Sequence, residues 1–163
     1  MIPEEEYEQY MKLHRRFSET YTTVYKYVMD FYPQPQKFIQ EAAPKVESYV
    51  EDFWDHKNAP PENGSFRELV FFAQDFKEFA ANANNVFEEY KVLHSQSGNY
   101  IKTIFRLKEK SEANCNDYAK LIPELNKLIT GFDQVKQKTD MAAKELQKLQ
   151  IEWGSLSGKM KPL

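Results

Sequence analysis

Apolar side chains recur along this chain at alternating steps of three and four residues, and this spacing constrains the fold more than any other feature. One series runs from Tyr7 to Phe31, and a longer one begins at Leu69 and keeps its phase as far as Met160. Such steps place side chains on one face of an α-helix, whereas a half-buried strand needs alternate positions. The spacing therefore predicts an all-α protein built from heptad-patterned helices.

Prolines and polar segments divide this pattern into separate helices. Pro33 and Pro35 end the first helix, because a residue that precedes proline avoids the helical region. Two prolines and an Asn-Gly pair mark 58–65 as a loop. We therefore expect a single domain over 1–163, with helices at about 4–31, 36–57, 65–95 and 100–153.

The boundary between the last two helices has conflicting signals. Gly98 and Asn99 are typical of a helix end, but the apolar phase continues across them without error. We expect a kink or a short turn at 95–99, and a second kink or a restart near Pro123. Residues 154–163 lose helix-forming side chains, which predicts a frayed tail.

The composition indicates what fills the core. The chain has 163 residues, of which 41% are hydrophobic, 15% aromatic and 29% charged, with a net charge of -3. Of its 24 aromatic residues, 21 precede Arg106. We expect an elongated antiparallel helical bundle or coiled-coil hairpin with an aromatic-rich core, formed mainly by residues 5–105.

Residue constellations that support catalysis or metal binding are missing from the sequence. The three histidines are far apart, and none has a carboxylate three residues before it, as a di-iron bundle requires. The one cysteine, Cys115, has no basic residue within four positions to activate its thiol. The five glycines are too scattered for a phosphate-binding loop. We predict no catalytic, cofactor-binding or metal-binding residue and expect a protein that is not an enzyme.

The length of the last helix suggests a partner. A continuous helix over 100–153 would be about 80 Å long at 1.5 Å per residue, longer than the helices that precede it. Part of its apolar stripe would then need cover from another protein or from a second copy. We therefore expect a non-enzymatic interaction module, such as a scaffold, adaptor or assembly subunit. Its candidate interface is Leu121, Leu125, Leu128, Phe132, Leu146, Leu149 and Trp153.

Charge and hydropathy leave one alternative open. Residues 98–163 have a net charge of +4, but their bases are interleaved with acids, which disfavours nucleic acid as a partner. The alternative is a membrane-associated helical protein of the membrane-shaping or pore-forming type, which would use the Phe-rich segment 66–87 or this basic C-terminal face. The longest apolar run, Leu69–Ala73, is too short to span a bilayer. One cysteine and an acidic first segment favour the cytoplasm.

Overall fold

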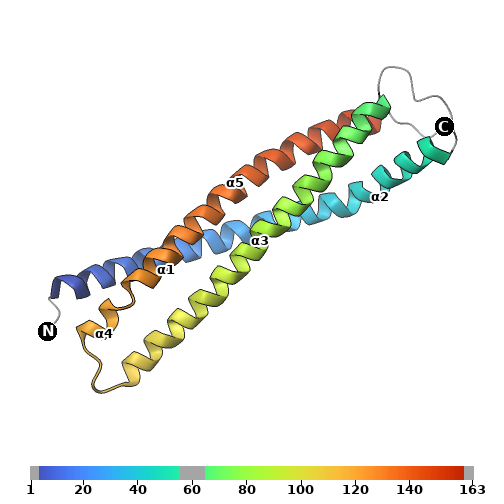
Figure 1. Cartoon of the computed structure of the whole chain (residues 1–163). Coiled ribbons are helices and arrows are strands. Elements are labelled where there is room, and N and C mark those ends of the chain that lie inside the picture. Colours follow the sequence, from blue (N-terminus) through green and yellow to red (C-terminus); the bar gives the residue numbers. More distant parts are fainter. Residues whose placement is uncertain (1–3, 56–64, 160–163) are drawn as a thin grey trace. The chain divides into compact units, whose positions relative to one another are not determined.

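The computed structural model describes residues 4–55 and 65–159, and every regular element within them is a helix (Figure 1). The prediction of an all-α fold is confirmed, and no strand occurs in the described part of the chain. The coiled-coil hairpin form stays a prediction. In chain order the helices are α1 (Glu4–Phe31), α2 (Pro33–Asp55), α3 (Ser65–Glu109), α4 (Cys115–Ala119) and α5 (Ile122–Lys159).

Proline chemistry accounts for the junction between α1 and α2. Helix α1 has the predicted bounds, and Tyr32 alone separates it from α2. Helix α2 begins at Pro33 rather than at residue 36, because proline suits the first helical position, where no N–H is needed. Pro44 lies inside α2, which continues through it. Residues 58–64 of the loop predicted at 58–65 lie outside the described residues, as do the expected last residues of the second helix, 56–57, and Ser65 is the first residue of α3.

Helix α3 is one continuous helix of 45 residues. The short turn expected at 95–99 is therefore wrong, because the helix continues through these residues, as the unbroken apolar phase indicated. A kink there stays a prediction. Gly98 lies in helical surroundings and has no left-handed backbone conformation. The chain leaves the helix only after Glu109, through residues 110–114.

A capping box starts the short helix α4. The Asn116 backbone N–H donates to Asn114 Oδ1 (2.9 Å), and the Asn114 backbone N–H donates to Asp117 Oδ2 (3.2 Å). Helix α5 then begins at Ile122, so the predicted restart near Pro123 is confirmed. Helix α5 continues to Lys159, so the expected frayed tail is wrong for residues 154–159, and 160–163 lie outside the described residues.

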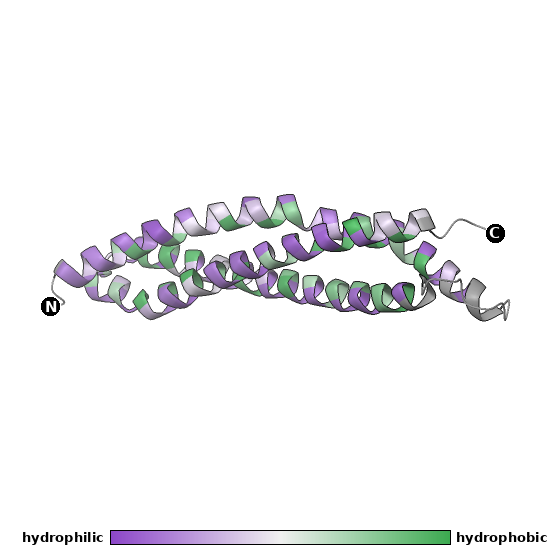
Figure 2. Cartoon of the chain, turned by 90° about the horizontal axis from the view of Figure 1, so that it is seen from above, coloured by the Kyte–Doolittle hydropathy of each residue, from purple (hydrophilic) through white to green (hydrophobic). Residues whose placement is uncertain are grey.

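The described residues group into two compact units, and the single-domain prediction stays a prediction. Unit 1 contains α1 up to Met29 and residues Val86–Lys138, which include the C-terminal part of α3, α4 and the start of α5. Unit 2 contains α2, the N-terminal part of α3 up to Asn85, and α5 from Thr139. Three long helical segments pack together in each unit, and each helix has one hydrophobic face, as Figure 2 shows.

Both units have the aromatic-rich core that the sequence predicted. The buried aromatic residues are Tyr10, Phe17, Tyr90, Tyr100 and Phe132 in unit 1, and Phe31, Tyr32, Phe38, Phe72, Phe76 and Phe79 in unit 2. The apolar phase also holds at two polar positions, since Ser97 and Thr139 are both buried. Ser97 Oγ donates to the Leu93 carbonyl (2.8 Å), and the hydroxyls of Thr139 and Tyr32 lie 3.4 Å apart. Hydrogen bonding therefore makes the burial of these two side chains tolerable.

Candidate interaction surface

The structure divides the seven predicted interface residues between the two units. Leu125, Leu128 and Phe132 are buried in unit 1, and Leu146 and Leu149 are buried in unit 2. The other two, Leu121 and Trp153, are half-buried. Trp153 stacks on Phe72 of the same unit, with ring centroids 5.4 Å apart.

This burial corrects the reason for predicting that interface. The argument assumed a last helix longer than its neighbours, but α5 has 38 residues and α3 has 45. Neighbouring helices of the same chain therefore cover the stripe of α5, and no partner is needed to keep it from water. Binding through these seven residues stays a prediction, but five of them are not accessible in the folded chain.

A buried hydrogen-bonded cluster joins α1 to α3 in unit 1. The hydroxyl of Tyr100 lies 2.8 Å from His14 Nδ1 and 3.2 Å from the hydroxyl of Tyr10. Burial, followed by the nearby Lys108 ammonium, lowers the pKa of His14, because both disfavour the charged imidazolium. Burial also raises the pKa of Tyr100 and of Tyr10. The cluster thus consists of neutral groups at neutral pH, and it fixes α1 against α3.

A second cluster lies nearer the middle of the chain's first helix. Tyr21 stacks on His94, and its hydroxyl lies 2.8 Å from His94 Nδ1, at an exposed position. The neighbouring Tyr90 is buried, and its hydroxyl has no hydrogen-bond partner among the described residues. Burial, with the nearby hydroxyls of Tyr21 and Tyr25, raises the pKa of Tyr90 to about 12. A proton therefore stays on this phenol throughout the physiological range.

Next to these clusters is a surface that we name the α1–α3 face. On α1 it begins one residue after the core position Tyr10 and continues at alternating steps of three and four residues. On α3 each of its residues likewise stands one position after a residue of the core stripe, such as Leu93. Most of these side chains are exposed, and the rest are half-buried. The face consists of Met11, Arg15, Ser18, Thr22, Tyr25 and Met29 on α1, and of Phe87, Lys91, His94, Gly98, Ile101 and Phe105 on α3.

Contacts on the two sides of α3 orient this face within unit 1. Leu93 packs on Gly131 of α5, where an added Cβ would lie only 2.6 Å from the Leu93 side chain. His94, the next residue, points 100° further round the helix and meets Tyr21 of α1 instead. The α1–α3 face therefore lies beyond the α1–α3 contact, on the side that α5 does not cover.

Four large apolar side chains of this face are exposed. Phe105 is 60% exposed, Met11 is 43% exposed, Tyr25, which stacks on Tyr21, is 42% exposed, and Met29 is 40% exposed. Near the middle of the face lies Gly98, where an added Cβ would meet no atom within 4 Å. Single exposed apolar residues are ordinary, but a periodic row on two adjacent helices is typical of a protein-binding surface.

Sequence analysis missed this face, although its signal is present in the sequence. Tyr25 and Met29, like Met11, stand one residue after positions of the core stripe, so their apolar character widens the hydrophobic face of α1 beyond a single seam. Counting those positions separately from the core stripe would have identified the α1 half. The α3 half could not be identified in that way, because its register against α1 depends on the tertiary contacts of Tyr21 and Tyr100.

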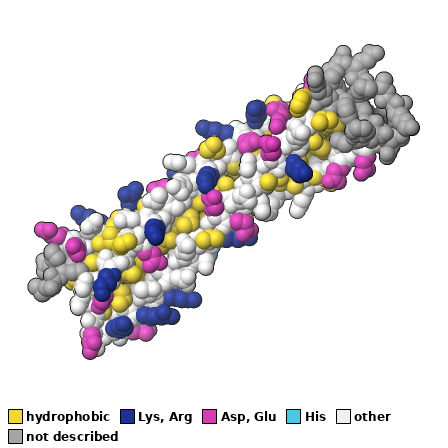
Figure 3. All heavy atoms as spheres, viewed as in Figure 1, with side chains coloured by type: hydrophobic (Ala, Val, Ile, Leu, Met, Phe, Trp, Pro, Cys, Tyr) yellow, Lys and Arg dark blue, Asp and Glu magenta, His cyan; other side chains and the backbone are white. Residues whose placement is uncertain are grey.

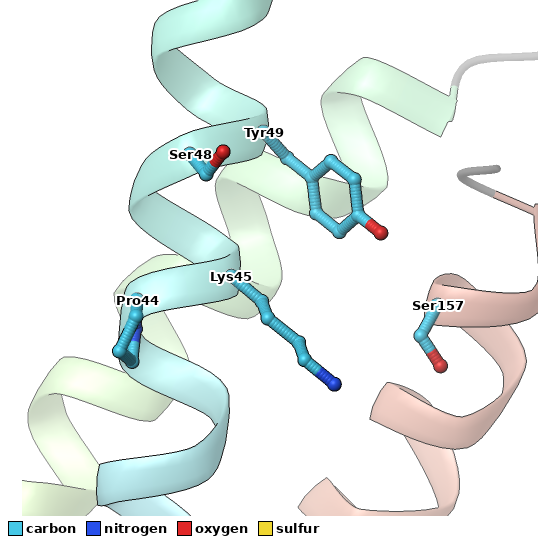
Figure 4. Close-up of a pocket in the computed structure, with 5 residues that line it drawn as sticks. All are labelled: Pro44, Lys45, Ser48, Tyr49 and Ser157. Carbon is cyan, nitrogen blue, oxygen red and sulfur yellow. The ribbon is translucent and has the colours of Figure 1, made fainter. Parts of the chain in front are cut away.

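A cavity of about 390 Å³ lies in unit 2 between α2 and α5 (Figure 4). Its lining includes the Lys45 ammonium, the hydroxyls of Ser48 and Ser157, and the Tyr49 ring. Pro44, Lys45 and Ser48 are exposed, and no hydrogen bond joins these lining groups to one another in the described residues.

The remaining residue types give no competing site. Among the described residues, no three histidine, cysteine or acidic side chains gather where they could hold a metal ion. Cys115 is a free, half-buried thiol at the start of α4. No helix in the described ranges combines the length and the apolarity that crossing a membrane requires. Comparisons with protein-family models, curated proteins and solved structures found no match to this chain.

Proposed function

We propose that this chain is a non-enzymatic interaction module, a scaffold, adaptor or assembly subunit, that binds another protein through the α1–α3 face. The observation that supports this most directly is that exposed apolar side chains of two adjacent helices lie on the same face, toward its two ends. Contacts of Tyr10 and His14 with Tyr100, and of Tyr21 with His94, show that α1 and α3 run antiparallel in unit 1. Two such helices with heptad-spaced surface residues suit the apolar face of a third helix.

The dimensions of the face suit a helix of moderate length. Met11 and Met29 are 18 residues apart in α1, which corresponds to about 27 Å at 1.5 Å per residue. Small side chains lie near the middle, at Ser18 and Gly98, and larger ones lie toward the two ends. Small residues let another backbone approach closely, while Phe105 and Tyr25 are exposed aromatic side chains toward the two ends. Fully burying one large apolar side chain stabilises a complex by roughly 1.5–3 kcal/mol.

The alternative function is association with a membrane surface, and burial weakens one of its two supports. In the Phe-rich part of α3, Phe72, Phe76 and Phe79 are buried in unit 2. Among the described large apolar residues there, Val70 and Phe71 are the exposed pair. A helix that inserts at a membrane interface needs a wide apolar face. Co-sedimentation with anionic and neutral vesicles tests this alternative. If the protein binds neither kind of vesicle, association with a membrane surface is excluded.

The proposed function is tested by reconstitution with purified proteins. Proteins that co-purify with the full chain are each produced separately. The dissociation constant of each one is then measured with the wild-type chain and with the variant Tyr25→Asp/Met29→Asp. We expect at least one protein whose affinity falls at least about tenfold in the variant, since both changes place charge on the binding face. The matched control, Met141→Asp/Ile151→Asp, changes two exposed apolar residues of α5 in unit 2. Equal loss in both variants, or no sensitive partner, would contradict the proposal.

A further inference from the structure

Two short segments of this acidic protein are strongly basic. Residues 9–18 contain three basic residues and no acid, and residues 101–110 contain four basic residues and one acid. Together they have seven bases against one acid, a net charge of +6, in a chain whose total is -3. Some 90 residues separate the segments, so neither one stands out in the sequence by itself.

The fold of unit 1 brings these two segments side by side. Tyr10 and His14 of the first segment both contact Tyr100, the residue that precedes the second. Lys108 is close enough to His14 to lower the pKa of the imidazole. Figure 3 shows dark blue side chains over the C-terminal part of α3, the helix that contains residues 101–109 of the second segment.

The basic side chains of both segments are exposed. All seven are exposed, and none forms an ion pair with a carboxylate of the described residues. By contrast, Lys91, which lies earlier in α3, pairs with Glu88, and Lys138 of α5 pairs with Glu89. The seven bases are Lys12, Arg15, Arg16, Lys102, Arg106, Lys108 and Lys110.

Helical spacing places some of these cations beside the exposed apolar residues. Arg15 lies one turn after Met11, and Lys102 lies one turn before Phe105. This end of the α1–α3 face therefore combines a large accessible aromatic side chain with cations on both helices. The other end, around Tyr25 and Met29, has Lys91 already paired with Glu88. The face is thus electrostatically asymmetric along its length.

We propose that this basic end selects, as the occupant of the α1–α3 face, an amphipathic helix of another protein that carries acidic residues beside its apolar stripe. The inference rests on the proposed function and specifies the chemistry of the partner. Carboxylates flanking the stripe would meet Arg15 and Lys102, while apolar side chains cover Met11 and Phe105. Charge complementarity of this kind sets the orientation and the selectivity of a helix pair more than its total affinity.

Labelled synthetic helices of about 18 residues test this inference. One has leucine at the a and d positions and glutamate at the flanking e and g positions, and its match has glutamine in place of each glutamate. Fluorescence anisotropy gives their affinities for the full chain at low and at high salt. We expect the glutamate helix to bind at least about tenfold more tightly at low salt, with a smaller difference at high salt.

Two charge-reversed variants locate the effect. Arg15→Glu/Lys102→Glu should abolish the preference for the glutamate helix. Lys144→Glu/Lys148→Glu changes the same charge at exposed positions of α5 in unit 2 and should retain it. Circular dichroism confirms that both variants are folded, and Phe105→Ala should weaken both helices alike. Retention of the preference in the first variant, or its loss in both, would overturn the inference.

Other results would overturn it in distinguishable ways. Equal binding of the two helices would refute the acidic partner and leave the proposed function in place. If neither synthetic helix binds, but a purified partner protein binds and is sensitive to Tyr25→Asp/Met29→Asp, a helical occupant of the face is refuted and the proposed function is not. Binding of phosphatidylserine vesicles but not of the glutamate helix would assign the basic end to lipid. Self-association that Arg15→Glu/Lys102→Glu abolishes would assign it to a second copy.

Discussion

Alanine at Gly98 and at Gly131 should have opposite consequences, although both glycines lie inside helices of unit 1. Replacing a helical glycine with alanine stabilises a helix by about 1 kcal/mol. At Gly98 the new methyl group meets no atom within 4 Å, so Gly98→Ala should deliver that gain in full. At Gly131 the same methyl group would lie 2.6 Å from one Leu93 methyl and 3.1 Å from the other.

The balance at Gly131 follows from these distances. Leu93 must move, and forcing an extra methyl group into a packed contact typically costs about 1–3 kcal/mol. Subtracted from the helical gain, this leaves Gly131→Ala between neutral and destabilised by about 2 kcal/mol. In a Leu93→Ala background the opposing methyl groups are absent, and Gly131→Ala should again stabilise by about 1 kcal/mol. The coupling between the two sites is therefore about 1–3 kcal/mol.

Urea unfolding followed by circular dichroism at 222 nm gives the free energy of unfolding of each variant relative to the wild type. The four variants are Gly98→Ala, Gly131→Ala, Leu93→Ala and Leu93→Ala/Gly131→Ala. Both glycines belong to unit 1, so the same structural unit reports each change. Destabilisation by Gly98→Ala of about 1 kcal/mol or more would show that α3 breaks at 95–99 and would refute the continuous helix. Equal stabilisation at both glycines would refute the close contact between Leu93 and Gly131.

Three further predictions concern buried residues of unit 1. Because burial lowers the pKa of His14 in the folded state, the unfolded chain takes up the proton first, and stability should fall as the pH drops through about 6.5. Urea midpoints at pH 7.5 and 5.5 measure this, and an equal fall in His14→Gln would contradict it. Tyr90→Phe removes an unpaired buried hydroxyl and should leave the unfolding free energy unchanged or raise it by about 1 kcal/mol, whereas Tyr100→Phe should lower it by about 1 kcal/mol. Leu128→Glu should unfold unit 1 rather than block an association, because Leu128 is buried. Circular dichroism reports the folding and sedimentation velocity reports the association. A folded variant that has lost self-association would instead support the predicted leucine interface.

Helix periodicity was sufficient to predict the fold class and the core. The stripe from Tyr7 to Phe31 matches α1, and in the longer stripe that begins at Leu69 even the polar members Ser97 and Thr139 are buried. Periodicity outweighed Gly98 because one glycine costs a helix only about 1 kcal/mol, less than the packing of a 45-residue helix supplies. The true break at 110–114 contains neither glycine nor proline, and its signal was the capping pair Asn114 and Asp117.

The site was harder to predict than the fold, for a physical reason. A stripe such as Leu125 and Leu128 shows that a helix face needs cover, but it does not say whether the same chain provides the cover. That depends on helix lengths and on the register between helices distant in sequence. The pairing of Arg15 with Lys102 depends on the same register, which the contacts of Tyr100 set.

The hydroxyl of Tyr100 has one proton and two close neighbours, and this permits two directions of donation. With neutral His14 accepting at Nδ1, Tyr100 donates to the imidazole and accepts from Tyr10. With a proton on Nδ1, the imidazole donates to Tyr100, which then donates to Tyr10. Protonation of His14 therefore reverses the direction of both hydrogen bonds without breaking either of them. The two helices would remain joined at that point after His14 is protonated, and ¹⁵N shifts of the imidazole would report the reversal.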